Sequence, residues 1–382
     1  MLDPADLGII ADDLTGACDV AACFLAGGGA VEVSLAPEGP FADGPGLQVT
    51  NTQSRLADPG TARQVLRLVG TRLAGKRVVF KKMDTGLRGP LGAELEGLME
   101  GLRDSGGLWS CVVAPAAPSI GRITRDGVQY DRGVPVDQGA LAQDPESPPR
   151  SAHIRTVIGL TGRVDFQVGD AGGPEDLQRI VDARLGEGRT VLAGSLGLAE
   201  ALARRLHPAR CGRPARPPAA RRPLLVCGSR HPLSSRQVEQ ARGAGLRIVS
   251  FDPARRHFGE DVAPTPEEGI VVRILPDAVP AEAASPGGIL AAFIDALDQR
   301  WERLAPDGLG IVGGETAYHL LRRLGAERLR VGRRQAEVIA GAQIAGGRMD
   351  GCPMVCKGGS VGPEDAVLQM LSLLKAHPRG QE

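Results

Sequence analysis

Short apolar runs alternate with amphipathic stretches along this chain, and the alternation predicts its fold. The runs have the length of strands, and in many of the stretches that follow them apolar residues recur every three or four positions, as in a helix. Strands that alternate with helices are typical of βαβ units, which build a parallel sheet. We expect strands at residues 7–11, 31–35, 78–80, 111–114, 190–193, 224–227, 247–251, 269–274 and 309–312. We expect helices at residues 14–26, 91–103, 198–206, 234–242, 317–324 and 366–374.

The segment 209–223 interrupts this pattern, because it is rich in proline and arginine and has no apolar periodicity. We therefore predict an N-terminal domain at residues 1–210, a linker at 211–223 and a C-terminal domain at 224–382. The predicted fold class is α/β, with a largely parallel sheet flanked by helices in each domain.

Three times in the C-terminal domain an expected strand leads into a glycine-containing turn and then a helix. The turns are Gly228 with Ser229, then 313–316, then 357–362. Such junctions lie at one edge of a parallel sheet, where ligands bind. Glycine and the N–H groups of a helix start suit a phosphate. Three turns within one domain predict a nucleotide site.

Two adjacent acids follow the first expected strand. Asp12 and Asp13 stand at its carboxyl end, just before an amphipathic helix. One aspartate is explained as the N-cap of that helix. The second is not needed for capping, and paired acids at a strand end indicate binding of hydroxyls or of a metal. A purely structural role stays open as the alternative.

A second polar cluster follows the strand that ends near residue 80. Lys81, Lys82, Asp84, Thr85 and Arg88 fall within eight residues, on a glycine-containing turn. An arginine there suits a carboxylate, the second lysine suits a phosphoryl group and the aspartate suits a hydroxyl proton. The alternative is a solvated loop of salt bridges.

Three further segments fit the same theme. The polar run 51–55 follows an expected strand end, and the segment after residue 114 offers Arg122 and Asp126. A fourth strand–turn–helix junction lies at Gly194 and Ser195, where close helix–sheet packing explains the glycine as well as a ligand does.

Composition narrows the class of function. The 45 basic and 45 acidic residues cancel, which argues against general attraction to nucleic acid or to an anionic membrane. Aromatic residues make up 3% of the chain, too few for a base-stacking surface. No apolar run approaches the roughly 18 residues that cross a bilayer, and no basic secretory region opens the chain. Seven cysteines without a Cys-x-x-Cys motif favour a reduced compartment. We expect a cytoplasmic protein that handles a small molecule.

Lysine is rare in this chain. Only five of the 45 basic residues are lysine, and the rest are arginine. Because arginine is so strongly favoured in this chain, a lysine indicates a position where a compact ammonium group is needed. Lys82 and Lys357 lie in two of the candidate clusters.

Taken in order, these motifs resemble the four-carbon acid sugar kinases, a two-domain family first described as a domain of unknown function. The resemblance runs nearly end to end. It depends on IADDLTGACD at 10–19, QSR at 53–55, KKMDTGLRGPLGAEL at 81–95, APAAPSIGRITRDG at 114–127, GSLGLAEAL at 194–202, GGETA at 313–317 and KGGSVGPED at 357–365.

The resemblance implies an N-terminal domain that binds a sugar acid and a C-terminal domain that binds ATP, with the active site in the cleft between them. The product would be a 4-phosphorylated threonate, erythronate or 3-oxo-tetronate. Carried over to this chain, the substrate pocket would consist of Asp12, Asp13, Arg55, Lys82, Asp84, Arg88 and Arg122. The ATP site would consist of Ser229, Gly313, Gly314, Glu315, Thr316, Lys357, Gly358 and Gly359.

The chain departs from the family pattern at several positions. Gly86 replaces a residue of the usual Asp-Ser-Thr-Leu-Arg and removes a hydroxyl beside the expected pocket. Cys18 replaces an asparagine, Val361 replaces an aromatic residue, and 230–232 read Arg-His-Pro where small hydroxyl residues are common. Despite these changes we still expect phosphoryl transfer, but they do not allow the exact substrate to be predicted.

The expected reaction is ATP-dependent phosphorylation with Mg²⁺, whose protein ligands stay unassigned. Asp84 or Asp13 would orient the acceptor hydroxyl, and Lys82 with Lys357 would offset the charge of the transferring group. The expected partner is a small sugar acid, without nucleic acid or membrane, and a homodimer is an open possibility.

Two alternatives stay open. A non-catalytic protein that senses sugar acids would keep the N-terminal cluster. A nicotinamide-dependent dehydrogenase would need a glycine fingerprint after a strand, whereas the G-x-G-x-x-G at 308–313 overlaps the expected strand itself.

Overall fold

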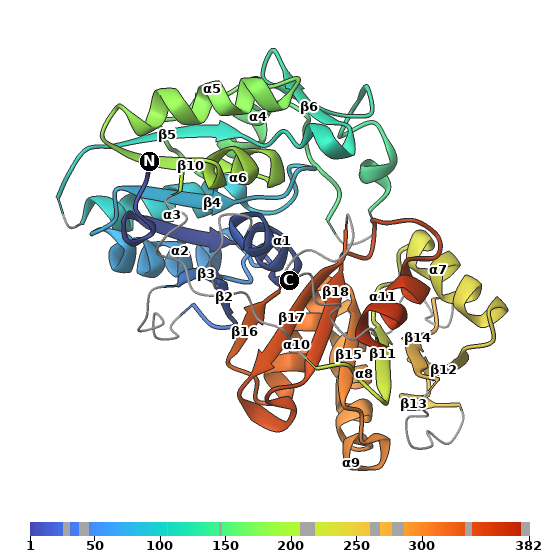
Figure 1. Cartoon of the computed structure of the whole chain (residues 1–382). Helices are drawn as coiled ribbons and strands as arrows, with labels where there is room; N and C mark the ends of the chain where they lie inside the picture. The colour runs from blue at the N-terminus through green and yellow to red at the C-terminus, as the bar shows by residue number, and fades with distance from the viewer. Residues whose placement is uncertain are drawn as a thin grey trace. The chain divides into compact units, whose positions relative to one another are not determined.

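The computed structural model describes residues 1–25, 31–37, 46–104, 106–144, 147–206, 218–259, 268–276, 286–332 and 338–375. The chain divides into two compact units, Met1–Pro214 and Ala215–Glu382. Their boundary falls within the predicted linker 211–223, of which 211–217 lie outside the described residues. Both units are α/β (Figure 1), which confirms the predicted fold class.

The first unit is built on a parallel sheet. The order across the sheet is β2 (Val31–Ser34), β3 (Leu47–Asn51), β1 (Leu7–Ala11), β4 (Val78–Lys82), β10 (Arg189–Gly194), β5 (Trp109–Ala114) and β9 (Gln167–Val168). Neighbouring strands of this sheet are parallel, and β1, β4 and β10 are central and almost wholly buried. Because the strands run in one direction, their carboxyl ends share one edge.

Helices cover both faces of this sheet (Figure 1), because its central strands are nearly continuous apolar runs whose side chains are buried on both faces. Val79 packs with Leu66 and Leu98 on one face, whereas the ring of Phe80 meets Phe24 edge-on, with 6.1 Å between the centroids. The face of Val79 carries α2 (Pro59–Leu73), α3 (Leu91–Arg103) and α4 (Ile154–Gly159). The face of Phe80 carries α1 (Leu14–Leu25), α5 (Pro174–Leu185) and α6 (Leu196–Ala203).

A small antiparallel sheet is inserted after β5, and the sequence pattern did not predict it. Its hairpin turns at Asp126 and Gly127, both with positive φ (51° and 73°), as the tight hairpin turn requires. The strands are β6 (Arg122–Arg125), β7 (Val128–Asp131) and β8 (Val134–Pro135).

The second unit has a mixed sheet with a parallel centre. The order is β13 (His257–Phe258), β12 (Arg247–Asp252), β14 (Ile270–Ile274), β11 (Pro223–Cys227), β15 (Gly308–Val312), β18 (Pro353–Lys357), β17 (Ala340–Ala345) and β16 (Arg328–Val331). Strands β12, β14, β11, β15 and β18 are parallel, and β13, β17 and β16 pair antiparallel to their neighbours. The sequence pattern missed β16 and β17.

Helices also cover both faces of the second sheet. Leu225 packs with Val238 and Met370 on one face, and on the other Phe293 stands 5.5 Å from Phe251 between ring centroids. The first face carries α7 (Pro232–Gly243) and α11 (Ala366–Lys375). The second carries α8 (Pro286–Asp298) and α10 (Gly314–Arg323), with α9 (Trp301–Leu304) following α8. Single 3₁₀ turns occur at Pro4–Asp6, Pro118–Ile120, Ala140–Gln143 and Gly347–Met349.

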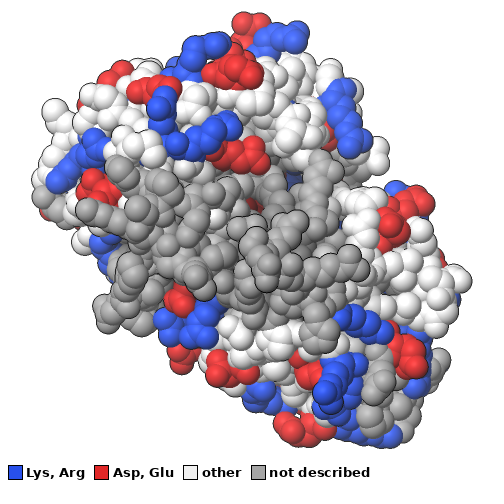
Figure 2. Space-filling view, in the orientation of Figure 1, with Lys and Arg blue, Asp and Glu red and all other residues white. Residues whose placement is uncertain are grey.

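Charged side chains of both signs are interspersed on the face shown in Figure 2, in keeping with the formal net charge of zero. Within the described parts of the chain, every helix is too short or too polar to cross a bilayer.

Candidate active site

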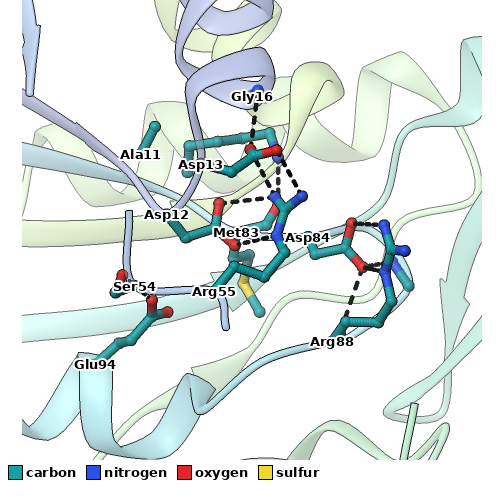
Figure 3. A network of polar contacts seen from close by, with 12 residues as sticks. Ala11, Asp12, Asp13, Gly16, Ser54, Arg55, Met83, Asp84, Arg88 and Glu94 are labelled. Atoms are coloured by element: carbon teal, nitrogen blue, oxygen red, sulfur yellow. Dashed lines mark hydrogen bonds and ion pairs between the residues drawn. The ribbon is translucent and has the colours of Figure 1, made fainter. Parts of the chain in front are cut away.

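Arg55 joins the two acids at the end of β1 (Figure 3). Its Nε and Nη2 donate to Asp12 Oδ2 and Oδ1 at 2.9 and 3.0 Å. Its Nη1 and Nη2 donate to Asp13 Oδ2 and Oδ1 at 2.7 and 2.8 Å. One guanidinium fork therefore binds both carboxylates, and it fixes the segment after β3 to the end of β1.

The two acids differ in their remaining contacts. Burial raises the pKa of Asp12, but Arg55 with Lys81 and Lys82 outweighs it and lowers the pKa to about 2. Asp13 also accepts hydrogen bonds from the Thr15 hydroxyl and the Gly16 N–H, at 2.7 and 2.9 Å. The predicted cap is therefore Asp13, and Asp12 stays ionised beside the cations.

The two lysines at the end of β4 point to opposite faces of the sheet. Lys82 Nζ donates to the Met83 carbonyl at 2.7 Å. It also lies beside the start of α1, because a Cβ placed on Gly16 would be 3.3 Å from Lys82 Nζ and 2.4 Å from Asp13 Oδ1. Glycine at position 16 thus leaves room for an ammonium and a carboxylate to share this space.

The turn after β4 is closed by Asp84 and Arg88. Arg88 Nε and Nη2 donate to the two carboxylate oxygens at 2.7 and 2.9 Å, and the Gly86 N–H adds a third bond at 3.0 Å. Burial raises the pKa of Asp84, but Arg88, Arg55 and Lys82 together hold it well below its usual range. Arg88 also donates from Nη1 to Asp144 Oδ2 at 2.6 Å.

Arg122 reaches the same turn from the small sheet. Its Nη1 donates to the Thr85 hydroxyl, and Gln129 Nε2 donates to the Thr85 carbonyl at 3.1 Å. The Nε of Arg122 is buried without a hydrogen-bond partner among the described residues, and the carboxylate of Asp131 lies 3.6 Å away. The hairpin, which the pattern did not predict, therefore brings a further cation to the site.

A buried network that sequence reasoning missed lies on the other side of β4. Lys81 Nζ is 3.0 Å from Glu94 Oε2 and donates to the Lys82 carbonyl at 2.9 Å. Glu94 accepts from the Ser54 hydroxyl, which lies 2.8 Å from the Thr52 hydroxyl. In the sequence, a glutamate in the first turn of a helix is explained by its favourable interaction with the helix dipole. The ion pair between Glu94 and Lys81 becomes evident only from the burial of both side chains in the structure.

A cavity of about 190 Å³ opens beside Arg55 in the first unit. Its wall includes Leu87, Gly89, Arg150 and Thr161. The cavity therefore adjoins both the Arg55 cluster and the turn that Asp84 and Arg88 close.

In the second unit the three glycine turns come together, as their positions at strand ends predict. A Cβ on Gly228 would lie 2.2 Å from Thr316 Oγ1, and one on Gly359 would lie 2.1 Å from Ser229 Oγ. Only glycine fits at these two positions without a shift of the neighbour. The first turn thus contacts the second through Thr316 and the third through Ser229.

Lys357 and Gly313 complete this edge of the second sheet. Lys357 is 1% exposed, its Nζ donates to the Gly358 carbonyl at 2.7 Å, and burial lowers its pKa to about 8. Gly313 donates its N–H to the Lys357 carbonyl at 2.9 Å, and its φ of 110° favours glycine. Gly314, Glu315 and Thr316 then open α10.

No three His, Cys, Asp or Glu side chains form a metal-binding group within the described ranges. In the first unit, the candidate carboxylates of Asp12, Asp13 and Asp84 are turned toward arginine instead.

Each of the two units matches a known family of protein domains. Residues 7–192 match the family of sugar-binding N-terminal domains, and residues 224–367 match the family of nucleotide-binding C-terminal domains. A D-threonate kinase of Bordetella bronchiseptica is 28% identical and covers 97% of each chain. A 3-oxo-tetronate kinase of Methylobacterium radiotolerans is 28% identical and covers 96% of this chain and 99% of its own.

The fold is similar to that of a Haemophilus influenzae protein from a family first described as a domain of unknown function. The TM-score is 0.67 at 18% identity, and the match covers 96% of this chain and 100% of the other. Both domain families in order, with full-length relatives that are kinases, show that the chain belongs to the four-carbon acid sugar kinase family and is an enzyme of the phosphotransferase class.

Proposed function

We propose that this protein uses ATP to phosphorylate the terminal C4 hydroxyl of a four-carbon sugar acid such as threonate, erythronate or 3-oxo-tetronate. The observation that carries the proposal is that each unit gathers its own cluster at the carboxyl edge of its sheet. The sugar-binding unit gathers acids and arginines, and the nucleotide-binding unit gathers glycine turns around Lys357.

The first cluster has the chemistry of a site for a hydroxylated anion. Arg55, Arg88, Lys82 and Arg122 supply positive charge for a carboxylate, and the acids supply acceptors for hydroxyl groups. The forks of Arg55 and Arg88 are already paired with protein carboxylates at 2.7 to 3.0 Å. A substrate would therefore share these cations with the protein, and the acids hold the cations in place.

The second cluster fits the phosphates of a nucleotide. Ser229, Gly313 with Gly314 to Thr316, and Lys357 with Gly358 and Gly359 form the predicted set. A Cβ at Gly228 or Gly359 would collide with the hydroxyl of Thr316 or Ser229, so the turns come this close only because the two glycines have no side chain. The N-terminus of α10 and the Lys357 ammonium suit negative charge.

Bound ATP would supply the phosphoryl group, with Mg²⁺ reducing its charge. Magnesium usually keeps several water ligands and binds only one or two carboxylates beside the phosphates, so a preformed protein cage is not needed. We assign no side chain to the metal.

Asp84 and Asp13 are the two candidates for holding the acceptor hydroxyl. Phosphoryl transfer passes through a loose transition state, so alignment contributes more than proton removal. Asp84, with its pKa held well below the usual range, is a weak base and a good hydrogen-bond acceptor. Lys82, 5% exposed beside Asp13, would offset developing charge.

The test is a coupled assay of ADP release across three- to six-carbon aldonates and 3-oxo-tetronate, with and without Mg²⁺. Magnesium-dependent turnover with a four-carbon acid is the expected result. Turnover confined to acids of another length would overturn the substrate class. Binding of MgATP by calorimetry without turnover of any acid would instead indicate a non-catalytic sensor.

A further inference from the structure

Two buried side chains of α7 contact the backbone of the loop 358–362, here called the glycine loop. Ser234 and Gln237 are three residues apart, so they share one face of the helix. Both are fully buried. Neither belongs to a glycine turn, and neither was a candidate from the sequence pattern.

Both side chains donate to carbonyl oxygens of the loop and its flank. The Ser234 hydroxyl donates to the Gly359 carbonyl at 2.7 Å. Gln237 Nε2 donates to the Pro363 carbonyl at 2.8 Å and lies 3.3 and 3.4 Å from the Val361 and Gly362 carbonyls. Four carbonyl groups in five residues are thus turned toward α7.

This orientation fixes where the N–H groups of the loop point. In a trans peptide the carbonyl and the N–H point in opposite directions, and the chain has no cis peptide among the described residues. The peptide N–H groups of Ser360, Gly362 and Glu364 therefore point away from α7. Backbone N–H groups that face one side of a glycine-rich turn form a seat for an anion.

Gln237 does more than fill space in the core. Its Oε1 is buried without a hydrogen-bond partner in the described part of the chain. A buried amide with one end unsatisfied is costly, and an apolar side chain of the same shape would avoid that cost. Gln237 therefore contributes through its NH₂ group, which holds the carbonyls of the loop.

The same loop is held from the side of the first turn. A Cβ on Gly359 would come within 2.1 Å of Ser229 Oγ and 3.4 Å of Ser234 Oγ. The loop thus lies directly against Ser229, which belongs to the proposed nucleotide site.

We propose that Ser234 and Gln237 are positioning residues of the nucleotide site: they hold the carbonyls of the glycine loop against α7 so that its N–H groups face the phosphates. This inference depends on the proposed function, because it assumes that the glycine loop binds a nucleotide. It adds α7 to the elements that determine nucleotide affinity, although neither side chain touches the ligand.

The test compares Gln237→Met and Ser234→Ala with matched controls on the same helix, Gln240→Met and Ser235→Ala. Gln240 is exposed and Ser235 half-buried. The dissociation constant for MgATP is measured by calorimetry on the full chain, and the KM for the acid by the ADP-release assay. We expect Gln237→Met to weaken MgATP binding on the order of tenfold, about 1.4 kcal/mol, and Ser234→Ala severalfold. The KM for the acid should stay within twofold, as should all values for the controls.

The possible outcomes distinguish failure of the proposed function from failure of the positioning role of Ser234 and Gln237. If the wild-type chain binds no MgATP, the nucleotide assignment fails and this inference fails with it. If the wild type binds MgATP and both variants bind it equally well, the proposed function stands and the positioning role is wrong. A change that affects the acid and the nucleotide alike would indicate general loosening of the fold and would also count against the inference. Ser234→Ala removes one hydroxyl only, so it provides a folded test even if Gln237→Met does not fold.

Discussion

Lys81 Nζ lies 3.0 Å from Glu94 Oε2, and each of the two side chains is 1% exposed. The pair links β4 to α3 in the interior of the first unit. Through the hydroxyls of Ser54 and Thr52, the network continues to the Ala11 carbonyl at 2.9 Å, next to the acids of the site. Charges buried this deeply gain little net stability from each other, but removing one partner leaves the other unpaired.

We therefore predict that Glu94→Gln and Lys81→Met each lower the free energy of unfolding by about 3–5 kcal/mol. The double variant Lys81→Met with Glu94→Gln should lose less than the sum of the two single losses, because no charge is left unpaired. Urea unfolding followed by circular dichroism measures the free energy of unfolding of the single and double variants. The control is Glu100→Gln on the same helix as Glu94, which removes an exposed ion pair with Arg63 of α2 and should change stability little. Equal losses for Glu94→Gln and Glu100→Gln would contradict the prediction.

Acid should destabilise the protein partly through Asp12. Its pKa is lowered from 3.8 to about 2 in the fold, so it contributes stability that is fully present above about pH 4. That contribution is lost as the pH falls from about 4 to about 2 and amounts to about 2 kcal/mol. Unfolding free energies measured between pH 6 and pH 2 should show the slope.

Arg55→Met is the matching variant, because it removes the main charge that lowers the pKa of Asp12. Since burial then dominates, the slope between pH 4 and pH 2 should shrink or reverse. An unchanged slope in Arg55→Met would show that Arg55 does not lower the pKa of Asp12.

The sequence predicted which residues meet at strand ends, because a parallel sheet brings those ends to one edge. Asp12 and Asp13 after β1, Lys82 at the end of β4 and Arg55 beyond β3 therefore lie together as expected. The same rule brings the three glycine turns of the second unit into contact.

The pattern could not predict contacts that depend on which face a side chain takes. Lys81 and Lys82 are adjacent and identical in type, yet one is paired in the core and the other borders the site. The position of Arg122 after the strand that ends at residue 114 made it a candidate, but the hairpin that carries it to the site has short strands without an apolar signal. Ser234 and Gln237 act on backbone carbonyls, and no residue pattern records such contacts.

Steady-state kinetics should show whether Asp84 or Asp13 holds the acceptor hydroxyl. The residue that holds the acceptor hydroxyl in the transition state should lower kcat when changed to asparagine, on the order of a hundredfold, with a smaller change in KM for the acid. Changing the other aspartate to asparagine should mainly disturb the arginine that it holds, and it should therefore raise the KM for the acid. Steady-state assays of Asp13→Asn and Asp84→Asn with saturating MgATP distinguish them. If both variants keep full turnover, neither carboxylate orients the hydroxyl.

Nucleotide affinity should depend on pH through Lys357. Burial lowers the pKa of this lysine to about 8, so it is largely a cation at pH 7 and loses its charge as the pH rises through 8. A phosphate group ionises near pH 6 and does not titrate above pH 7.5. The dissociation constant for MgATP should therefore rise between pH 7.5 and pH 9.5, by roughly tenfold if the ammonium contributes about 1.4 kcal/mol. Bound nucleotide favours the charged form, so the decline of kcat should fall at higher pH than the decline of kcat/KM.

Lys357→Met is the decisive variant for this pH dependence. At pH 7.5 it should bind MgATP as weakly as the wild type does at pH 9.5, and its affinity should no longer change with pH. Lys375→Met, at the exposed end of α11, is the control and should keep the wild-type profile. A pH profile that persists in Lys357→Met would assign the titration to another group and remove Lys357 from the nucleotide site.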